Sequence, residues 1–227
     1  KDPIYTLKTN FIGTMNLLEL ARKKSSIFIQ ASTSEVYGDP EKHPQQETYF
    51  GNVNTVGLRS CYDEGKRVAE TLCNDYSQKY SLDTRIIRIF NTYGPGMDIN
   101  DGRVISNFLV NIIKNTPLEI YGNGNQTRSF CYIDDLLEGL IRASKIKFDY
   151  PINLGNDKEI SLNQLVNLLK DKFGKLKVKH LDSVSDDPKS RKPSLKIAKK
   201  TLNWSPSTSI DQGLLETYQY FKKVLDD

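Results

Sequence analysis

Cysteine and histidine are scarce in this chain of 227 residues, which contains three cysteines and two histidines. Cys61, Cys73 and Cys131 show no C-x-x-C spacing, and so few nitrogen and sulfur ligands do not supply a tetrahedral zinc site. An odd number of scattered cysteines is typical of free thiols in a reducing compartment. We therefore expect no metal site, buried free thiols and a cytoplasmic location.

Long apolar runs and a strong charge of one sign are missing as well. No stretch approaches the about 18 consecutive apolar residues of a membrane-spanning helix, and the opening KDPIYTLKTN has no apolar segment of a signal peptide. The sequence leaves open whether a membrane anchor precedes residue 1. The net charge of +4, from 32 Lys+Arg and 28 Asp+Glu, is too small to indicate a nucleic-acid partner. With 37% hydrophobic residues, the chain can form a packed core.

The first half alternates helices with short buried strands. Apolar spacing predicts amphipathic helices over residues 3–23 and 62–80, and apolar runs predict strands over 27–31 and 85–90. A long polar segment, 32–61, joins the first strand to the second helix, and loops of that length are usually functional. This order predicts an α/β class, a doubly wound Rossmann-like parallel sheet.

The second half is less regular and predicts a smaller α+β lobe. We expect residues 1–98 to belong to the Rossmann domain and 99–227 mainly to the lobe, with the chain crossing back between them. The expected helices are 102–115, 133–144, 161–173, 195–201 and 210–224, and the expected strands are 118–121, 129–132, 151–154 and 176–181.

A parallel sheet that opens with a helix lacks the strand from which that helix returns. A Gly-rich dinucleotide motif is also missing: the nearest string, Gly122 to Thr127, lacks the third glycine and runs into a strand-like segment. We expect a hairpin turn there. If the protein uses a nucleotide cofactor, we expect the half of the domain that binds the cofactor pyrophosphate to lie outside these residues. Cofactor binding by this chain alone is therefore in doubt.

Tyr62 and Lys66 are spaced i and i+4, so they share one face of the predicted helix. A free tyrosine titrates near about pH 10, and a neighbouring ammonium favours the phenolate, which can then take a proton from an alcohol. The bare spacing is common in solvated helices. It gains weight because two buried strands run into polar segments, Ser32 to Gly38 and Asn91 to Pro95, at the sheet edge where open α/β folds bind ligands.

Several segments together resemble the extended short-chain dehydrogenase/reductases that act on nucleotide sugars, and among them the UDP-glucuronic acid decarboxylase (UDP-xylose synthase) subfamily. The resemblance spans essentially the whole chain from KTNFIGTMNLLELA at 8–21. It is carried further by ASTSEVYGDP (31–40), CYDEGKRVAET (61–71), RIFNTYGPGM (88–97), NDGRVISNF (100–108), YGNGNQTRSFCYIDDL (121–136) and SRKPSLKIAKKTLNW (190–204). Members of this family open with a Gly-rich Rossmann turn, and this chain departs from them at its amino end.

The resemblance implies a decarboxylase that uses tightly held NAD: C4 of UDP-glucuronate is oxidised, carbon dioxide leaves the β-keto acid, and the hydride returns. Tyr62 would be the base for the C4 hydroxyl, Lys66 would tune it, and Thr33 would hydrogen-bond the same hydroxyl. Ser34 and Glu35 would lie near C5 and the leaving carboxylate. The sixth catalytic residue by resemblance, Arg191, would contact that carboxylate or relay a proton, although a surface arginine on a basic stretch is the simpler alternative.

Binding residues are also implied by the resemblance. NAD would be held by Tyr62, Lys66, Thr9, Ala31 and Thr92. The nucleotide sugar would be held by Lys8, Asn16, Asn91, Arg103, Tyr121, Arg128 and Arg191.

Three other functions stay open. Nucleotide-sugar 4,6-dehydratases typically have Asp where this chain has Ser34, and 4-epimerases usually lack the glutamate at position 35. A non-catalytic nucleotide-sugar-binding or dimerisation fragment is the alternative of another class, and a Gly-rich turn upstream of Lys1 would exclude it. Apolar residues on more than one face predict that helices 3–23 and 62–80 form a four-helix bundle with a second copy.

Overall fold

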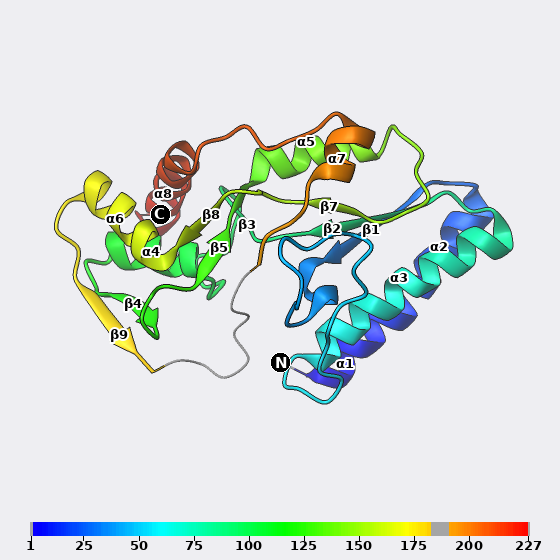
Figure 1. Cartoon of the computed structure of the whole chain (residues 1–227), viewed down its shortest axis with the longest axis horizontal. Helices are drawn as coiled ribbons and strands as arrows, with labels where there is room; N and C mark the ends of the chain where they lie inside the picture. The colour runs from blue at the N-terminus through cyan, green and yellow to red at the C-terminus, as the bar shows by residue number, and fades with distance from the viewer. Residues whose placement is uncertain (1, 183–190, 227) are drawn as a thin grey trace.

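The computed structural model describes residues 2–182 and 191–226. Its centre is a parallel sheet of β1 (Phe28–Thr33), β2 (Thr84–Ile89) and β7 (Ile152–Leu154), in the order β1-β2-β7 (Figure 1). The third strand comes from the second half of the sequence. All three strands end at the same edge, which is where the polar segments after β1 and β2 begin.

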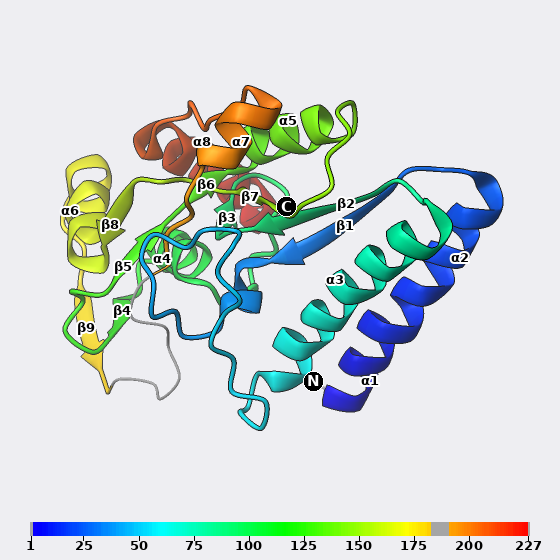
Figure 2. The same ribbon diagram turned by 45° about the vertical axis from the view of Figure 1, so that its right-hand side comes forward.

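Helices cover both faces of this sheet, as Figure 2 shows. One face carries α2 (Thr14–Lys24) and α3 (Ser60–Tyr80), and the other carries α5 (Ile133–Ala143) and α7 (Lys196–Leu202). Adjacent residues of β2 serve the two layers: Ile86 packs with α2 and α3, whereas Ile87 is fully buried with α5 and α7. This alternation, which any strand imposes, confirms the predicted α/β class.

The first predicted helix is interrupted. It consists of α1 (Pro3–Lys8), a π-helical turn η1 (Thr9–Gly13) and α2. Asp2 caps its start by accepting hydrogen bonds from the amides of Ile4 (2.9 Å) and Tyr5 (3.1 Å), while Ser25 ends it in the left-handed conformation. Asn10 in the π-turn packs against Gly65, where an added Cβ would lie 3.1 Å from the Asn10 Cβ. The first helix and α3 therefore approach closely at the first turns of α3.

In residues 92–182 and 191–226, the second lobe contains three small two-stranded sheets and the helices α4 (Val104–Ile113), α6 (Leu162–Phe173) and α8 (Ile210–Asp226). Its apolar core includes Phe108, Leu165 and Phe221. The sheets pair β3 (Thr92–Tyr93) with β6 (Cys131–Tyr132), β4 (Leu118–Tyr121) with β9 (Val178–Leu181), and β5 (Thr127–Ser129) with β8 (Glu159–Ser161).

The predicted hairpin at Gly122 to Thr127 is wrong. Gly122 and Gly124 do turn the chain with positive φ, but β4 pairs in parallel with β9 and β5 pairs antiparallel with β8. The turn is held instead by Asn163, whose amide donates to the carbonyl of Asn123 at 3.0 Å. Strands β3 and β8 were missing from the sequence expectations.

Two further observations bear on the sequence expectations. All three cysteines are free thiols; Cys73 and Cys131 are buried as expected, whereas Cys61 is half-buried. Within residues 2–182 and 191–226, no helix is long and apolar enough to cross a membrane.

Candidate active site

The end of β1 turns sharply into a short 3₁₀ helix, η2 (Ser34–Tyr37). Thr33 caps this helix, because its Oγ1 accepts a hydrogen bond from the Glu35 amide at 3.2 Å. Gly38 ends it with φ of +62°, where a Cβ would lie 1.9 Å from the Asn52 carbonyl oxygen, so only glycine fits. Within this turn the Glu35 side chain is 19% exposed.

Arg191 binds this turn from a segment far along the chain. Its guanidinium donates to the carbonyl oxygens of Ser34 at 2.7 Å and Gly38 at 3.3 Å, and to Glu35 Oε2 at 3.3 Å. The arginine is only 3% exposed, so the surface-arginine alternative is wrong. A buried guanidinium with an acidic partner and carbonyl acceptors is well suited to meet a second carboxylate.

Tyr62 and Lys66 lie on α3 beside the same strand end. Lys66 Nζ donates to the carbonyl oxygen of Ala31 at 3.0 Å and lies 5.9 Å from the centre of the Tyr62 ring. Burial lowers the pKa of the Lys66 ammonium. Tyr62 is half-buried, so its phenol is not enclosed in packed hydrocarbon.

Two charged residues that flank Tyr62 were missed by the sequence reasoning. Arg59 Nη2 lies 3.3 Å from Glu35 Oε2, and so pairs with the same carboxylate oxygen as Arg191. Asp63 is 9% exposed; burial first, and then the charge of Glu35, raises its pKa to about 6. In the sequence, only the positions of Arg59 and Asp63 close to the Tyr-x-x-x-Lys motif could have indicated that they belong to the site.

The structure therefore brings the predicted catalytic residues of three segments into one neighbourhood. Asp63, next to Tyr62, interacts electrostatically with Glu35 and Arg191, so the first turn of α3 faces the η2 turn. Helix α3 also packs directly on β1 and η2. Lys66 thus lies at the end of β1, and the first turn of α3, which carries Tyr62, lies against the η2 turn that carries Glu35.

Arg103 extends the cluster toward the second lobe. Its Nη1 donates to the Thr92 carbonyl oxygen at 3.4 Å, and its Nη2 to Asp101 Oδ2 at 2.8 Å. The hydrogen bond that Arg103 donates to Asp101 raises the Arg103 pKa most, and the phenol of Tyr62 contributes to that rise, which places the guanidinium near Tyr62. Half-buried Asn91 follows β2 and accepts a hydrogen bond on its backbone from Cys131 at 2.9 Å.

The remaining predicted residues lie on other elements. Lys8 ends α1, Thr9 begins η1 and Asn16 is on α2, and all three side chains are exposed. Tyr121 on β4 is 44% exposed, and Arg128 on β5 donates from Nη1 to the Thr127 carbonyl oxygen at 2.8 Å. Contacts of these five with a nucleotide sugar or cofactor stay predictions.

A buried polar network beneath the cluster fixes the long segment between β1 and α3. Arg88 on β2 donates to Glu70 Oε2 at 2.7 Å and to the Tyr37 hydroxyl at 3.0 Å, and that hydroxyl donates to Asn153 at 2.8 Å. Burial raises the pKa of Tyr37 to about 12, so the hydroxyl stays a donor. Because these hydrogen bonds tie η2 to β2, β7 and α3, the η2 turn sits on a rigid base.

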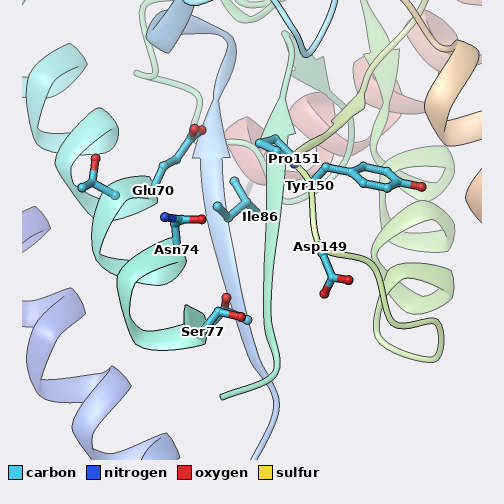
Figure 3. A pocket seen from close by; sticks show the side chains of 9 residues that line it. Glu70, Asn74, Ser77, Ile86, Asp149, Tyr150 and Pro151 are labelled. Atoms are coloured by element: carbon cyan, nitrogen blue, oxygen red, sulfur yellow. The ribbon is translucent and has the colours of Figure 1, made fainter. Parts of the chain in front are cut away.

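A separate cavity of about 300 Å³ lies farther along α3, toward its carboxyl end (Figure 3). Figure 3 shows Glu70, Asn74 and Ser77 of α3 on one side and Asp149 and Tyr150 on the other, with β2 between them. As far as the described residues go, its lining comes from the later turns of α3 and not from the first turn. It is therefore not the site formed by Tyr62 and Glu35.

Comparison with known proteins agrees with this fold and site. UDP-glucuronic acid decarboxylase 1 of Xenopus tropicalis is 48% identical over 226 residues, which are 99% of this chain and 54% of the relative. The chain thus spans about half the length of the curated relatives it matches.

Two solved structures show the same fold. The UDP-glucose 4-epimerase of Thermotoga maritima, solved with UDP-glucose, superposes with a TM-score of 0.90 at 29% identity and covers 99% of this chain and 72% of its own. The UDP-glucuronic acid 4-epimerase of Bacillus cereus, solved with UDP-glucuronic acid and NAD, gives 0.83 at 29% identity, covering 96% and 68%. They confirm the Rossmann-like prediction. Finally, the family model described as GDP-mannose 4,6 dehydratase matches residues 1–217, so this chain belongs to that family.

Proposed function

We propose that the full-length protein converts UDP-glucuronate to UDP-xylose with NAD as cofactor, through a 4-keto sugar. The observation that supports this most is the buried Arg191, which pairs with Glu35 at 3.3 Å beside Asp63, the residue that follows Tyr62 on α3. A carboxylated sugar needs a cation of this kind beside C5. The proposal agrees with the 48% identity to a UDP-glucuronic acid decarboxylase.

The residues at the end of β1 fit the nicotinamide end of NAD. Lys66 Nζ donates one hydrogen bond to the Ala31 carbonyl at 3.0 Å. Its other two N–H groups can donate to a ribose hydroxyl. Besides Lys66, the proposed NAD-binding residues are Tyr62, Thr9, Ala31 and Thr92. When bound, NAD supplies a hydride acceptor and returns the hydride at the end of the reaction.

Tyr62 is the proposed base for the C4 hydroxyl. The ammonium of Lys66 lies 5.9 Å from the centre of its ring, one helical turn along α3. Thr33, whose side chain is fixed as the cap of η2, orients the same hydroxyl. The expected effect of such a positioned base is about 10² to 10⁴ in rate.

Arg191 and Glu35 act on the carboxylate side of the sugar. Arg191 orients the leaving carboxylate, and Glu35 steers the return of a proton to C5 after carbon dioxide has left. Ser34 takes part through the turn itself, since its carbonyl is anchored by Arg191 at 2.7 Å. A 4-keto group makes the loss of carbon dioxide easy because the electrons enter an enolate.

Nucleotide binding is assigned mainly to the second lobe. We propose that Asn91, Arg103 and Arg128 bind the diphosphate and that Tyr121 packs near the uridine. Lys8 and Asn16 would approach the sugar from the first helix. Forked guanidinium donors match phosphate oxygens better than an ammonium does.

A 4,6-dehydratase is the second candidate, since the matching family model carries that description. Position 34 argues against it: dehydration needs an acid to expel a hydroxyl, and Ser34 is a buried, weakly acidic side chain, 2% exposed. A 4-epimerase needs neither Glu35 nor Arg191 in this arrangement.

We also propose that the protein forms a homodimer through the first helix and α3. The first helix exposes Ile4, Tyr5, Phe11, Leu17 and Leu20 by 42–69%. Such an apolar face is normally covered in the mature protein. Three free thiols favour the cytoplasm as its location.

The function is tested by incubating the full-length protein with UDP-glucuronate and, separately, with dTDP-glucose. We expect a mass loss of carbon dioxide from UDP-glucuronate and no change of dTDP-glucose. Tyr62→Phe should lower carbon dioxide release by at least about 100-fold. Tyr80→Phe, at the far end of α3, is the matched control and should leave the rate unchanged.

The role of Glu35 is tested in the same assay. Glu35→Gln should slow carbon dioxide release more than it slows oxidation of C4. Conversion of dTDP-glucose in preference to UDP-glucuronate, or full activity of Tyr62→Phe, would refute the proposal.

A further inference from the structure

Asp63 is a buried acid to which the proposed reaction assigns no role. It lies in the first turn of α3, next to Tyr62, and is 9% exposed. Among the described residues, its Oδ1 is the one buried side-chain oxygen or nitrogen that lacks a hydrogen-bond partner. A buried carboxyl oxygen without a donor favours the protonated, neutral form of the group.

The charges around Asp63 come from three segments. The Glu35 carboxylate on η2 and Glu64 on α3 repel a negative Asp63, while Arg59 and Arg191 attract it. Both guanidiniums are already engaged with Glu35, each at 3.3 Å from its Oε2. The two arginines therefore balance two carboxylates in the cluster, Glu35 and an ionised Asp63.

A sugar carboxylate that binds beside Arg191 adds a third negative charge to two guanidiniums. Either Glu35 gives up a guanidinium, or one carboxyl in the cluster becomes neutral. Asp63 is the better candidate for neutralisation, because Glu35 keeps two short ion pairs and Asp63 has an oxygen with no donor.

We propose that Asp63 is a positioning residue that takes up a proton from solvent when the sugar carboxylate binds, so that Glu35 keeps its arginines. This rests on the proposed function, since it needs a substrate with a carboxylate at C5. The balance is simple: one Asp63 carboxylate, one bound sugar carboxylate and one proton give a neutral Asp63 beside the bound anion.

Proton uptake is measured by isothermal titration calorimetry of the full-length protein in buffers of different ionisation enthalpy. The Tyr62→Phe background keeps the substrate from reacting. Since the pKa of Asp63 is raised to about 6, this group is roughly one-tenth protonated at pH 7, and binding of UDP-glucuronate should take up as much as about 0.9 proton. At pH 5 uptake should fall to about 0.1 proton, and UDP-xylose, which has no carboxylate, should bind without uptake at either pH.

Asp63→Asn in the same background identifies the group. It should abolish the uptake at pH 7 while UDP-glucuronate still binds, whereas Asp75→Asn, an exposed position on α3, should retain it. Glu35→Gln gives an independent readout that does not depend on how Asp63→Asn folds. Because this change removes one of the three negative charges that share the two guanidiniums, it should lower the uptake to less than half.

The outcomes separate the two proposals. Binding of UDP-glucuronate without proton uptake, or full uptake in Asp63→Asn, overturns the role of Asp63 alone. Undiminished uptake in Glu35→Gln would mean that competition with Glu35 for the two arginines does not drive the protonation, and it also overturns the proposal. Failure of the protein to bind either nucleotide sugar overturns the proposed function, and the role of Asp63 with it.

Discussion

Arg191→Met should destabilise the protein by about 3–5 kcal/mol, even without any ligand. The guanidinium is 3% exposed and donates to the carbonyl oxygens of Ser34 and Gly38. Each carbonyl left without a donor costs about 1–3 kcal/mol. Loss of the pair with Glu35 adds about 1 kcal/mol or less, because Arg59 stays 3.3 Å from the same oxygen.

Urea unfolding followed by the fluorescence of Trp204, the single tryptophan, measures this loss. Trp204 is 2% exposed in the described fold, so its emission reports unfolding of the core. Lys192→Met is the matched control: the lysine side chain is 29% exposed, its ammonium lies 3.7 Å from Glu159, and its loss should cost less than about 1 kcal/mol. Arg191→Lys should lie between the two, because an ammonium cannot serve all of these acceptors. A stability of Arg191→Met within about 1 kcal/mol of wild type would refute the structural role of this arginine.

Two further changes test the polar contacts around the site. Glu70→Gln leaves the Arg88 guanidinium, 12% exposed, without its charged partner, and should lower the free energy of unfolding by about 3 kcal/mol; an unchanged urea midpoint would contradict this. Burial alone would raise the pKa of Glu159, but hydrogen bonds from Thr127 and His43 bring it below its ordinary value of 4.5. Its stabilising effect is therefore present above that value and is lost as the pH falls through the lower pKa of the folded state. Glu159→Gln should accordingly lower the melting temperature at pH 7 and do so less at pH 3, and an equal loss at both pH values would count against the assignment.

Local features of the chain could be predicted from its sequence alone. The helical spacing of Tyr62 and Lys66 depends only on the geometry of one helix, and both side chains are indeed found on one face of α3 beside β1. The alternation of amphipathic helices and apolar strands likewise depends on short stretches of sequence. The fold class and most element boundaries followed from these patterns within about two residues.

The pairing of strands that are distant in the sequence could not be predicted in this way. The residues of β4 and β9 are paired across about 60 positions, and nothing in either apolar run identifies its partner. The expected hairpin was wrong for this reason. A turn signal states that the chain reverses, but burial in a shared core selects which strands then meet.

The site likewise contains residues that local motifs indicated and residues that only tertiary packing brought together. Short motifs indicated Tyr62, Lys66 and Glu35, because a strand end and one helix turn are local structures. That Arg191 lies under Glu35, 156 positions away, and that Asp63 is buried beside the same carboxylate, depended on the packing of η2, α3 and the segment at 191. Burial and the sum of nearby charges set how a carboxyl group behaves, and both arise from residues that approach one another only in the folded chain.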